Sequence, residues 1–187
     1  LRLLAPDGMS NPLTFQVGVL PEVRESAFSA GPQALPLEVP VLLNGQITPG
    51  ETDRIPLRLR RGQKLVCRLQ ARHLNPYLAD AVPGWFQAAL ALFGPDGREV
   101  AWCDDYRFEP DPVLLHEVAA DGLYRLEVWD ALYRGRDDFV YRVAVGELPW
   151  VTEVFPLGAR QDSPTAGAVI HGWNLPVEWV PYDTRAG

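Results

Sequence analysis

A stretch of twelve residues, Ala101–Pro112, concentrates the side chains of this sequence that could do chemistry. It reads AWCDDYRFEPDP and holds four carboxylates, three aromatic rings and one cysteine. Calcium takes its oxygen ligands from several carboxylates, and glycoside hydrolysis uses carboxylates in pairs. Rings on a loop offer a surface to a sugar or a peptide. The stretch could therefore be a metal site, a catalytic acid pair, a binding rim or a polar turn.

The carboxylates of this stretch are the candidate ligands of a calcium ion. They are Asp104, Asp105, Glu109 and Asp111. Calcium takes six to eight oxygens, and a spacing interrupted by Pro110 and Pro112 matches no calcium-loop motif. The other interpretation is a strand-to-strand loop in which Asp104 or Asp105 accepts hydrogen bonds from backbone amides. We expect no resident cofactor, and calcium is the one ion that the stretch could hold.

Aromatic residues on predicted loops and outward strand positions form a second candidate site, a platform for a sugar or a peptide. They are Tyr77, Trp85, Trp102, Tyr106, Phe108 and Trp129. The opposing interpretation is that the insertion Asn75–Trp85 folds back and buries these rings, because large rings dominate burial. The sequence leaves both interpretations open.

One predicted hairpin carries basic side chains at its outward positions. These are Arg54, Arg58, Arg60, Lys64, Arg68 and Arg72. A sulfated or acidic polymer could bind such a row. Alternatively, the row pairs with the surplus carboxylates of the chain or stays solvated, as most surface charges do.

Familiar hydrolase motifs do not occur in the sequence. The histidines are His73, His116 and His171. None of them forms the His-x-x-x-His pair of zinc hydrolases, and no serine lies in a Gly-x-Ser-x-Gly turn. A glycosidase acting through the carboxylates of Ala101–Pro112 is disfavoured, because such pairs stand about 5–10 Å apart across a cleft and these share one loop. We therefore expect a non-catalytic chain.

Composition limits the partners of the chain. It has 24 acidic and 17 basic residues, a net charge of −7 and a pI near 4.9. Nucleic-acid binders usually carry a basic excess, so we expect no nucleic acid as partner. The longest apolar run, Ala88–Phe93, is shorter than the about 20 residues of a membrane span, so we expect no membrane insertion. Cys67 and Cys103 are too few for a disulfide scaffold, and we expect both thiols to be free.

Alternation of apolar and polar residues with period two dominates the chain, and helical periodicity is nearly missing. The positions predicted to face a core are Ile55, Leu57, Leu59, Leu65, Cys67, Leu69, Leu90, Leu92, Tyr124, Leu126, Val128, Phe139, Tyr141 and Val143. Turn signals such as Asn44-Gly45 and Pro49-Gly50 separate the alternating runs, and a short turn near residues 76–81 is the one helical candidate. This pattern predicts an all-β fold, an antiparallel jelly-roll-like β-sandwich.

The order of several weak motifs is more specific than any one of them. The motifs are Leu43–Ile47, Gly62–Val66, Leu90–Gly97 followed by Asp104-Asp105, Asp121–Val128 and Asp138–Val143. Together they resemble the bacterial pre-peptidase C-terminal (PPC) domain over about Leu35–Gly146. The resemblance implies a non-catalytic, jelly-roll-like sandwich appended to secreted proteases and other exported enzymes. Relatives of that family bind collagen with calcium at an acidic linker. Here Glu25–Phe28 reads Glu-Ser-Ala-Phe where the family often has Glu-Pro-Asn-Asp, so the resemblance does not carry that calcium site to this chain.

The two ends of the chain resemble something else. Ser10–Gly18 resembles the closing strand of an immunoglobulin-like domain of the IPT/TIG kind, and Val151–Gly158 with Gly172–Pro176 resembles the opening strands of another. The predicted organisation is terminal strands of one immunoglobulin-like segment over residues 1–20, a linker over 21–34, the PPC-like sandwich over 35–146 and the start of a second immunoglobulin-like segment over 147–187. We therefore expect the chain to be a piece cut from a larger multidomain protein.

These observations lead to one expected function and one alternative. We expect a non-catalytic module of a larger secreted, periplasmic or cell-surface bacterial protein, used for recognition, adhesion or the spacing of domains. Its expected partners are a polysaccharide or an extracellular protein, besides the other domains of the parent chain. The alternative is the accessory, substrate-targeting region of an exported protease or other degradative enzyme whose catalytic domain lies elsewhere in the parent chain.

Overall fold

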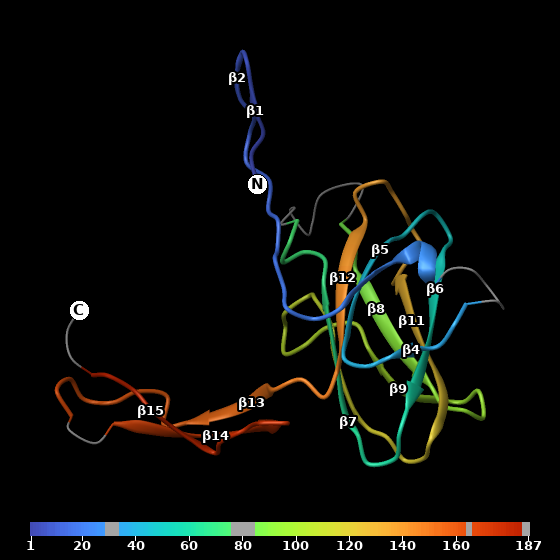
Figure 1. The fold of residues 1–187 in the computed structure, drawn as a ribbon. Coiled ribbons are helices and arrows are strands. Elements are labelled where there is room, and N and C mark those ends of the chain that lie inside the picture. Colours follow the sequence, from blue (N-terminus) through green and yellow to red (C-terminus); the bar gives the residue numbers. More distant parts are fainter. Residues whose placement is uncertain (29–33, 76–84, 164–165, 185–187) are drawn as a thin grey trace.

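Two five-stranded β-sheets pack face to face at the centre of the structure (Figure 1). The computed structural model describes residues 1–28, 34–75, 85–163 and 166–184. Alternating side chains give each long strand one apolar face, and the two apolar faces bury each other. The predicted antiparallel β-sandwich is therefore confirmed.

The first sheet, called the β7 sheet, has the strand order β10-β7-β12-β5-β3. Its strands are β10 (Val113–Glu117), β7 (Lys64–Gln70), β12 (Val140–Gly146), β5 (Val41–Gln46) and β3 (Glu22–Arg24). All neighbours are antiparallel except β3, which runs parallel to β5. Because β3 lies inside the range 21–34 that was predicted to be a linker, part of that linker belongs to the sandwich.

The second sheet, called the β6 sheet, has the strand order β4-β6-β11-β8-β9. Its strands are β4 (Leu37–Glu38), β6 (Thr52–Leu59), β11 (Gly122–Asp130), β8 (Ala88–Phe93) and β9 (Glu99–Cys103). As the apolar run Ala88–Phe93 predicts, β8 is an interior strand and five of its six residues are buried. The small Ala89 and Ala91 lie between the tryptophans of the two neighbouring strands, Trp129 and Trp102.

The core contains every residue that the alternation placed there. All fourteen predicted positions, from Ile55 on β6 to Val143 on β12, are buried. Cys67 is one of them, Cys103 packs against the core from β9, and both thiols are free. Burial raises the pKa of Cys67, and it raises the pKa of Cys103 to about 12, so neither sulfur is a thiolate near neutral pH.

Two local expectations were wrong. Consecutive strands β6 and β7 do not form a hairpin within one sheet, because the chain crosses from the β6 sheet to the β7 sheet at the turn between them. Asn44-Gly45 is not a turn but lies inside β5. Gly45 is needed there because the Tyr141 ring of the neighbouring strand β12 lies across it, and a Cβ at Gly45 would approach that ring to 2.3 Å.

The ends of the chain extend away from the sandwich (Figure 1). At the N-terminus, β1 (Leu4–Ala5) and β2 (Gly8–Met9) form a small hairpin, and residues 10–18 form no strand. At the C-terminus, β13 (Trp150–Phe155), β14 (Gly167–Trp173) and β15 (Trp179–Pro181) form a three-stranded antiparallel sheet. The strand pairing expected of Val151–Gly172 is present, whereas that expected of Ser10–Gly18 is not.

Helical structure is minimal in the residues that the structure describes. It consists of one 3-10 turn, η1 (Glu25–Ala27), and no helix of the described chain is long and apolar enough to cross a membrane. The turn predicted near residues 76–81 lies outside the described residues.

Candidate functional site

The loop between β9 and β10 contains the acidic stretch, and Asp111 fixes it to the end of β7. The Asp111 carboxylate accepts the backbone N–H groups of Ala71 at 3.1 Å, Arg72 at 2.9 Å and His73 at 2.8 Å. These amides follow the last residue of β7, where the ladder to β10 has ended, so the carboxylate takes the place of a strand partner. The expected backbone cap exists, but Asp111 provides it rather than Asp104 or Asp105.

A strained turn stands at the tip of the same loop. Tyr106 and Glu109 exchange backbone hydrogen bonds of 2.9 and 3.0 Å, and the two residues between them have positive φ, 52° at Arg107 and 70° at Phe108. Glycine and asparagine normally occupy these positions, because a Cβ makes this backbone conformation costly. The turn nevertheless holds Phe108 fully exposed, at 100%. Strain of this kind concentrates at functional sites.

An aromatic and cationic cluster lies beside that turn. The Tyr106 and Trp150 rings meet edge to face, with centroids 5.3 Å apart and planes at 77°. The Arg68 guanidinium lies 5.7 Å from the Trp150 ring centroid, and the Arg107 guanidinium lies 5.5 Å from that of Tyr106. Cation–π contact holds both arginines against rings without neutralising their charge.

Trp150 reaches the cluster because the C-terminal sheet is anchored to the sandwich. Trp150 is the first residue of β13. The Asn174 side chain, after β14, donates from Nδ2 to the carbonyls of Lys64 at 2.8 Å and Leu148 at 3.1 Å. Asn174 has φ 51°, a conformation that asparagine tolerates better than most residues. The join between sandwich and C-terminal sheet therefore has a fixed side-chain anchor.

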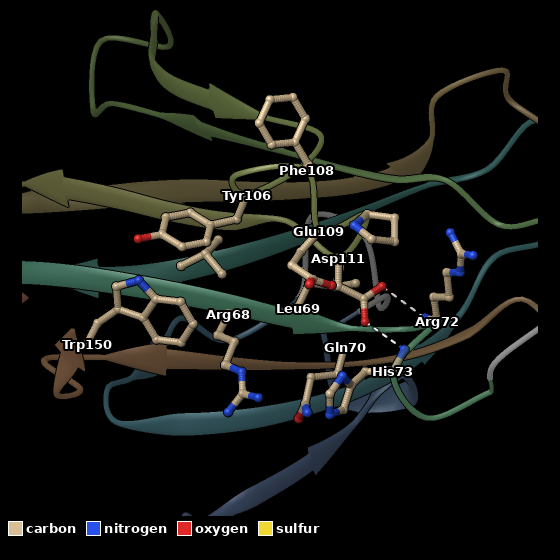
Figure 2. Close-up of a pocket in the computed structure, with 12 residues that line it drawn as sticks. Arg68, Leu69, Gln70, Arg72, His73, Tyr106, Phe108, Glu109, Asp111 and Trp150 are labelled. Atoms are coloured by element: carbon tan, nitrogen blue, oxygen red, sulfur yellow. Dashed lines mark hydrogen bonds between the residues drawn. The ribbon is translucent and has the colours of Figure 1, made fainter. Parts of the chain in front are cut away.

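These parts enclose a groove of about 620 Å³ on the outer face of β7 (Figure 2). Its walls include Arg68, Gln70, Arg72, Tyr106, Phe108 and Trp150. This volume is in the range of small-molecule sites. The groove combines ring faces with basic and amide groups, and His73, Glu109 and Asp111 also line it.

Several polar groups of this groove have no protein partner among the residues that the structure describes. Arg68, Arg72 and Arg107 form no ion pair within the described parts of the chain. The Gln70 side chain is only 6% exposed and has no hydrogen-bond partner among the described residues. In the same part of the chain, the buried Tyr106 Oη and Trp150 Nε1 are unpartnered as well. Because buried polar groups are nearly always satisfied, Tyr106 Oη and Trp150 Nε1 are exceptions in the described part of the chain.

The structure separates the aromatic residues that the sequence grouped together. Tyr106 and Phe108 line the groove, but Trp85 is buried in the core beside Phe139. Trp102 and Trp129 belong to strands of the β6 sheet, and Tyr77 lies outside the described residues. The sequence did not point to Trp150 as a groove residue, since nothing in its local pattern shows that the C-terminal segment folds back onto β7.

The four candidate calcium ligands do not gather in the described structure. Asp104, Asp105, Glu109 and Asp111 form no group of three whose oxygens all lie within 4.8 Å of one another. Asp111 is directed at backbone amides, and Glu109 faces the groove (Figure 2). Calcium binding by this loop stays a prediction.

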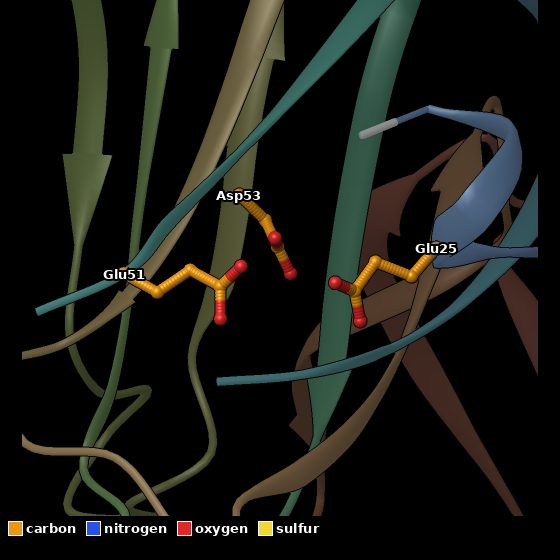
Figure 3. A group of neighbouring side chains, drawn as sticks. All are labelled: Glu25, Glu51 and Asp53. Carbon is orange, nitrogen blue, oxygen red and sulfur yellow. The ribbon is translucent and has the colours of Figure 1, made fainter. Parts of the chain in front are cut away.

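A different cluster of three acidic residues meets this distance limit (Figure 3). Ligand atoms of Glu25, Glu51 and Asp53 all lie within 4.8 Å of one another. Asp53 is 2% exposed and accepts a 2.5 Å hydrogen bond from the Tyr141 hydroxyl. Glu25 accepts the Gln46 backbone N–H at 3.0 Å. The group offers three of the six to eight oxygens that calcium takes.

The environment of Asp53 favours its protonated form. Burial is the main cause that raises its pKa to about 7, and the neighbouring Glu25 and Glu51 add to the rise, while the Tyr141 hydrogen bond opposes it. Burial also raises the pKa of Tyr141, which therefore stays a donor. A sequence signal for this buried acid existed: Asp53 is in phase with Ile55, Leu57 and Leu59 on the core face of β6.

Comparisons with known proteins add little to this description. No protein-family model matches the chain, and no curated protein matches it. Among solved structures, the chain is similar to PliG of Aeromonas hydrophila, a periplasmic lysozyme inhibitor of g-type lysozyme. The two are 16% identical over 56% of this chain and 83% of PliG, with a TM-score of 0.35.

Proposed function

We propose that this chain is a non-catalytic recognition module of a larger exported bacterial protein, and that the groove beside Trp150 is its ligand site. In this proposal the sandwich is a PPC-like domain, and the module lies outside the cytoplasm as part of a secreted, periplasmic or cell-surface protein. Its ligand is a polysaccharide or an extracellular protein.

One observation supports this proposal most strongly: the groove has polar groups without protein partners next to exposed rings. Gln70 lines the groove, and Arg68 and Arg72, which also line it, have no carboxylate partners in the described chain. A groove that only filled space would leave these groups solvated or paired. Trp150 and Tyr106 add the rigid contact area that recognition sites commonly use.

The proposal that the chain is not an enzyme rests on where its acids lie. Asp53, whose raised pKa would suit a general acid, is 2% exposed on the core side of β6. Asp111 of the groove is saturated by three backbone amides. Neither carboxylate is placed to exchange protons with a substrate held in the groove.

Ligand-dependent thermal stabilisation tests the proposal. Wild-type protein would be heated with a panel of neutral and acidic oligosaccharides and of collagen-type peptides, because a ligand that binds only the folded state raises the Tm. We expect at least one panel member to raise the Tm of wild type but not of Trp150→Ala. Trp102→Ala is the matched control, since Trp102 is 52% exposed on β9 of the other sheet.

Either of two results would count against the proposal. One is that no panel member changes the Tm of the wild type. The other is that Trp102→Ala abolishes the response while Trp150→Ala keeps it, which would place the ligand on the β6 sheet. Circular dichroism of both variants at 20 °C would establish that each retains the β-sheet fold.

A further inference from the structure

We propose that the groove binds acidic polysaccharides, with arginine side chains reading the carboxylates of uronate sugars; this inference rests on the proposed recognition function. Three features of the groove lead to it: the geometry of its rings, the state of its charges and the pairing of the backbone beneath it.

The rings form a corner and an exposed edge rather than a closed apolar pocket. Tyr106 and Trp150 stand at 77° to each other, and Phe108 is presented at the rim by the strained turn (Figure 2). Ring faces pack against the apolar C–H faces of sugars while leaving sugar hydroxyls free to hydrogen-bond. Gln70 lines the groove, and its amide can both donate to and accept from such hydroxyls.

Arg68, Arg72, Glu109 and Asp111 are the charged groups that line the groove, and its arginines are the basis for an anionic ligand. Arg68 and Arg72 line it, and Arg107 adjoins it on the turn; none of the three has a carboxylate partner in the described chain. Three backbone N–H groups already satisfy the Asp111 carboxylate, so it is not directed at either arginine. A guanidinium fork matches the two oxygens of a carboxylate, and Arg binds planar anions bidentately where Lys acts as a point charge.

The backbone under the groove argues against an extended peptide as ligand. Peptides commonly add to a sheet through free backbone groups at its edge. The groove instead lies on β7, which is paired on one side with β10 and on the other with β12. Recognition here must use side chains, which suits a carbohydrate.

The overall charge of the chain argues against a dense polyanion. A net charge of −7 repels closely spaced phosphates or sulfates, so only a local match between single arginines and single carboxylates overcomes it. Uronate polymers carry one carboxylate per acidic sugar, which is a spacing that separate arginines can follow.

Isothermal titration with defined oligomers tests this inference. The probes are tetragalacturonate, its fully methyl-esterified form with the same rings but no charge, tetraglucuronate and a dextran sulfate fragment. We expect at least one uronate tetramer to bind, with affinity at least tenfold above the esterified form. We expect Arg68→Ala and Arg72→Ala each to weaken uronate binding on the order of tenfold, as for the loss of one charge-assisted contact.

Two further variants make the test specific to the groove. Arg72→Lys keeps the charge but loses the fork, so we expect it to weaken uronate binding nearly as much as Arg72→Ala does. Arg60→Ala is the matched control, because Arg60 also lacks an ion pair in the described chain but lies on the turn that precedes β7, away from the groove residues that follow the other end of β7. It should leave every affinity unchanged.

The outcomes separate this inference from the proposed function. Equal binding of charged and esterified tetramers, lost in Trp150→Ala but not in the arginine variants, would overturn the acidic-sugar inference and leave the recognition function standing. Dextran sulfate binding as well as the uronates, with Arg72→Lys unchanged, would overturn it in favour of general charge attraction. Binding of a panel peptide at the groove with no uronate binding would also overturn it, whereas no binding of any probe would overturn both.

Discussion

The arginines on the outer face of the β6 sheet and those at the groove of the β7 sheet differ in their partners. On the β6 sheet, Arg54 and Arg125 both contact Glu127, at 3.2 and 2.7 Å, and Arg58 contacts Glu38 at 3.2 Å. On the β7 sheet, Arg142 contacts Glu22, whereas Arg68 on β7 and Arg72 just after it have no carboxylate partner within the described chain. Among the described residues, the β6 sheet therefore pairs its own arginines, and the groove end of the β7 sheet does not.

Strand register is the cause of this difference. Glu127 lies directly across from Arg54 in the β6–β11 pairing, and Glu38 lies across from Arg58 in the parallel β4–β6 pairing. Cross-strand pairs of opposite charge are in direct reach of each other. The cross-strand neighbours of Arg68 are instead Val113 and Ala144, which cannot neutralise it.

Two buried carboxylates, Asp130 and Asp53, show a similar contrast between a charge with partners and a charge without a basic partner among the described residues. Asp130, 0% exposed, is held by Arg134 and by the backbone N–H of Gln87, and these contacts outweigh its burial and lower its pKa. Among the described residues, the neighbours of the Asp53 carboxylate are the Tyr141 hydroxyl and two glutamates, and burial, with the glutamates adding to it, raises its pKa to about 7. A paired buried charge stabilises a fold near neutral pH, and an unpaired one opposes it.

The largest expected effect concerns Asp53 and pH. Its folded pKa, about 7, lies above its unfolded value of 3.8, so the folded state binds more protons between these values. The free energy of unfolding should therefore fall as pH rises from about 4 to about 7 and then level off. The shift of about three pKa units corresponds to at most about 4 kcal/mol. Urea denaturation in EDTA from pH 4 to 8 should show Asp53→Asn more stable than wild type at pH 8 and nearly equal to it at pH 4.

Asp130→Asn is the matched comparison and should respond with the opposite sign. Because its folded pKa is lowered, ionised Asp130 contributes stability above its unfolded pKa of 3.8, and that contribution is lost as pH falls through the folded pKa. Asp130→Asn should therefore destabilise the protein at pH 7. If both asparagine variants move stability in the same direction at pH 8, the contrast between the two acids is wrong.

The next largest effect is expected from a substitution that detaches the loop between β9 and β10 from the end of β7. Asp111→Ala leaves the backbone amides of Ala71, Arg72 and His73 without their acceptor, and we expect it to lower the free energy of unfolding by about 3 kcal/mol. Chemical denaturation at pH 7 measures this loss. Asp105→Ala is the control, since Asp105 is exposed, and a change beyond about 0.5 kcal/mol there would contradict the assignment of the cap to Asp111.

A smaller effect should separate stability from recognition at the tip of the loop. Phe108 is fully exposed with φ 70°, so Phe108→Gly removes backbone strain without removing buried area. We expect the free energy of unfolding to rise by about 1 kcal/mol while ligand binding in the groove weakens. Phe108→Ala should weaken binding equally but bring no such gain, because alanine keeps the strained φ. A loss of stability in Phe108→Gly would show that the ring supports the fold.

The smallest effect is expected on the outer face of the β6 sheet. Glu127→Gln removes the shared partner of Arg54 and Arg125, whose side chains are 64% and 42% exposed, and should cost about 0.5 kcal/mol. It should leave groove affinities unchanged in titration. A marked change in ligand binding would mean that the two faces are not independent.

Much of the fold could be predicted because burial and alternation are local properties. Ile55, Leu57 and Leu59 identify the core face of β6 without any knowledge of its partners. Asn44-Gly45 misled the prediction because a turn signal says nothing about the Tyr141 ring that requires a glycine inside the strand. The burial of Asp53 could have been predicted, because Asp53 alternates in phase with the apolar residues of β6. Its contact with two other carboxylates could not have been predicted.

By itself the sequence determined which side chains are buried, that the fold is an all-β sandwich and that Tyr106 and Phe108 stand on a loop. Only the tertiary structure decided what these loop rings meet. Trp150 reaches Tyr106 across 44 positions of sequence, and, among the described residues, Arg54 has a carboxylate partner while Arg68 has none. The physical reason is that alternation depends on each residue and its immediate neighbours, whereas pairing depends on sheet order and register, which are set by contacts among strands distant in the chain.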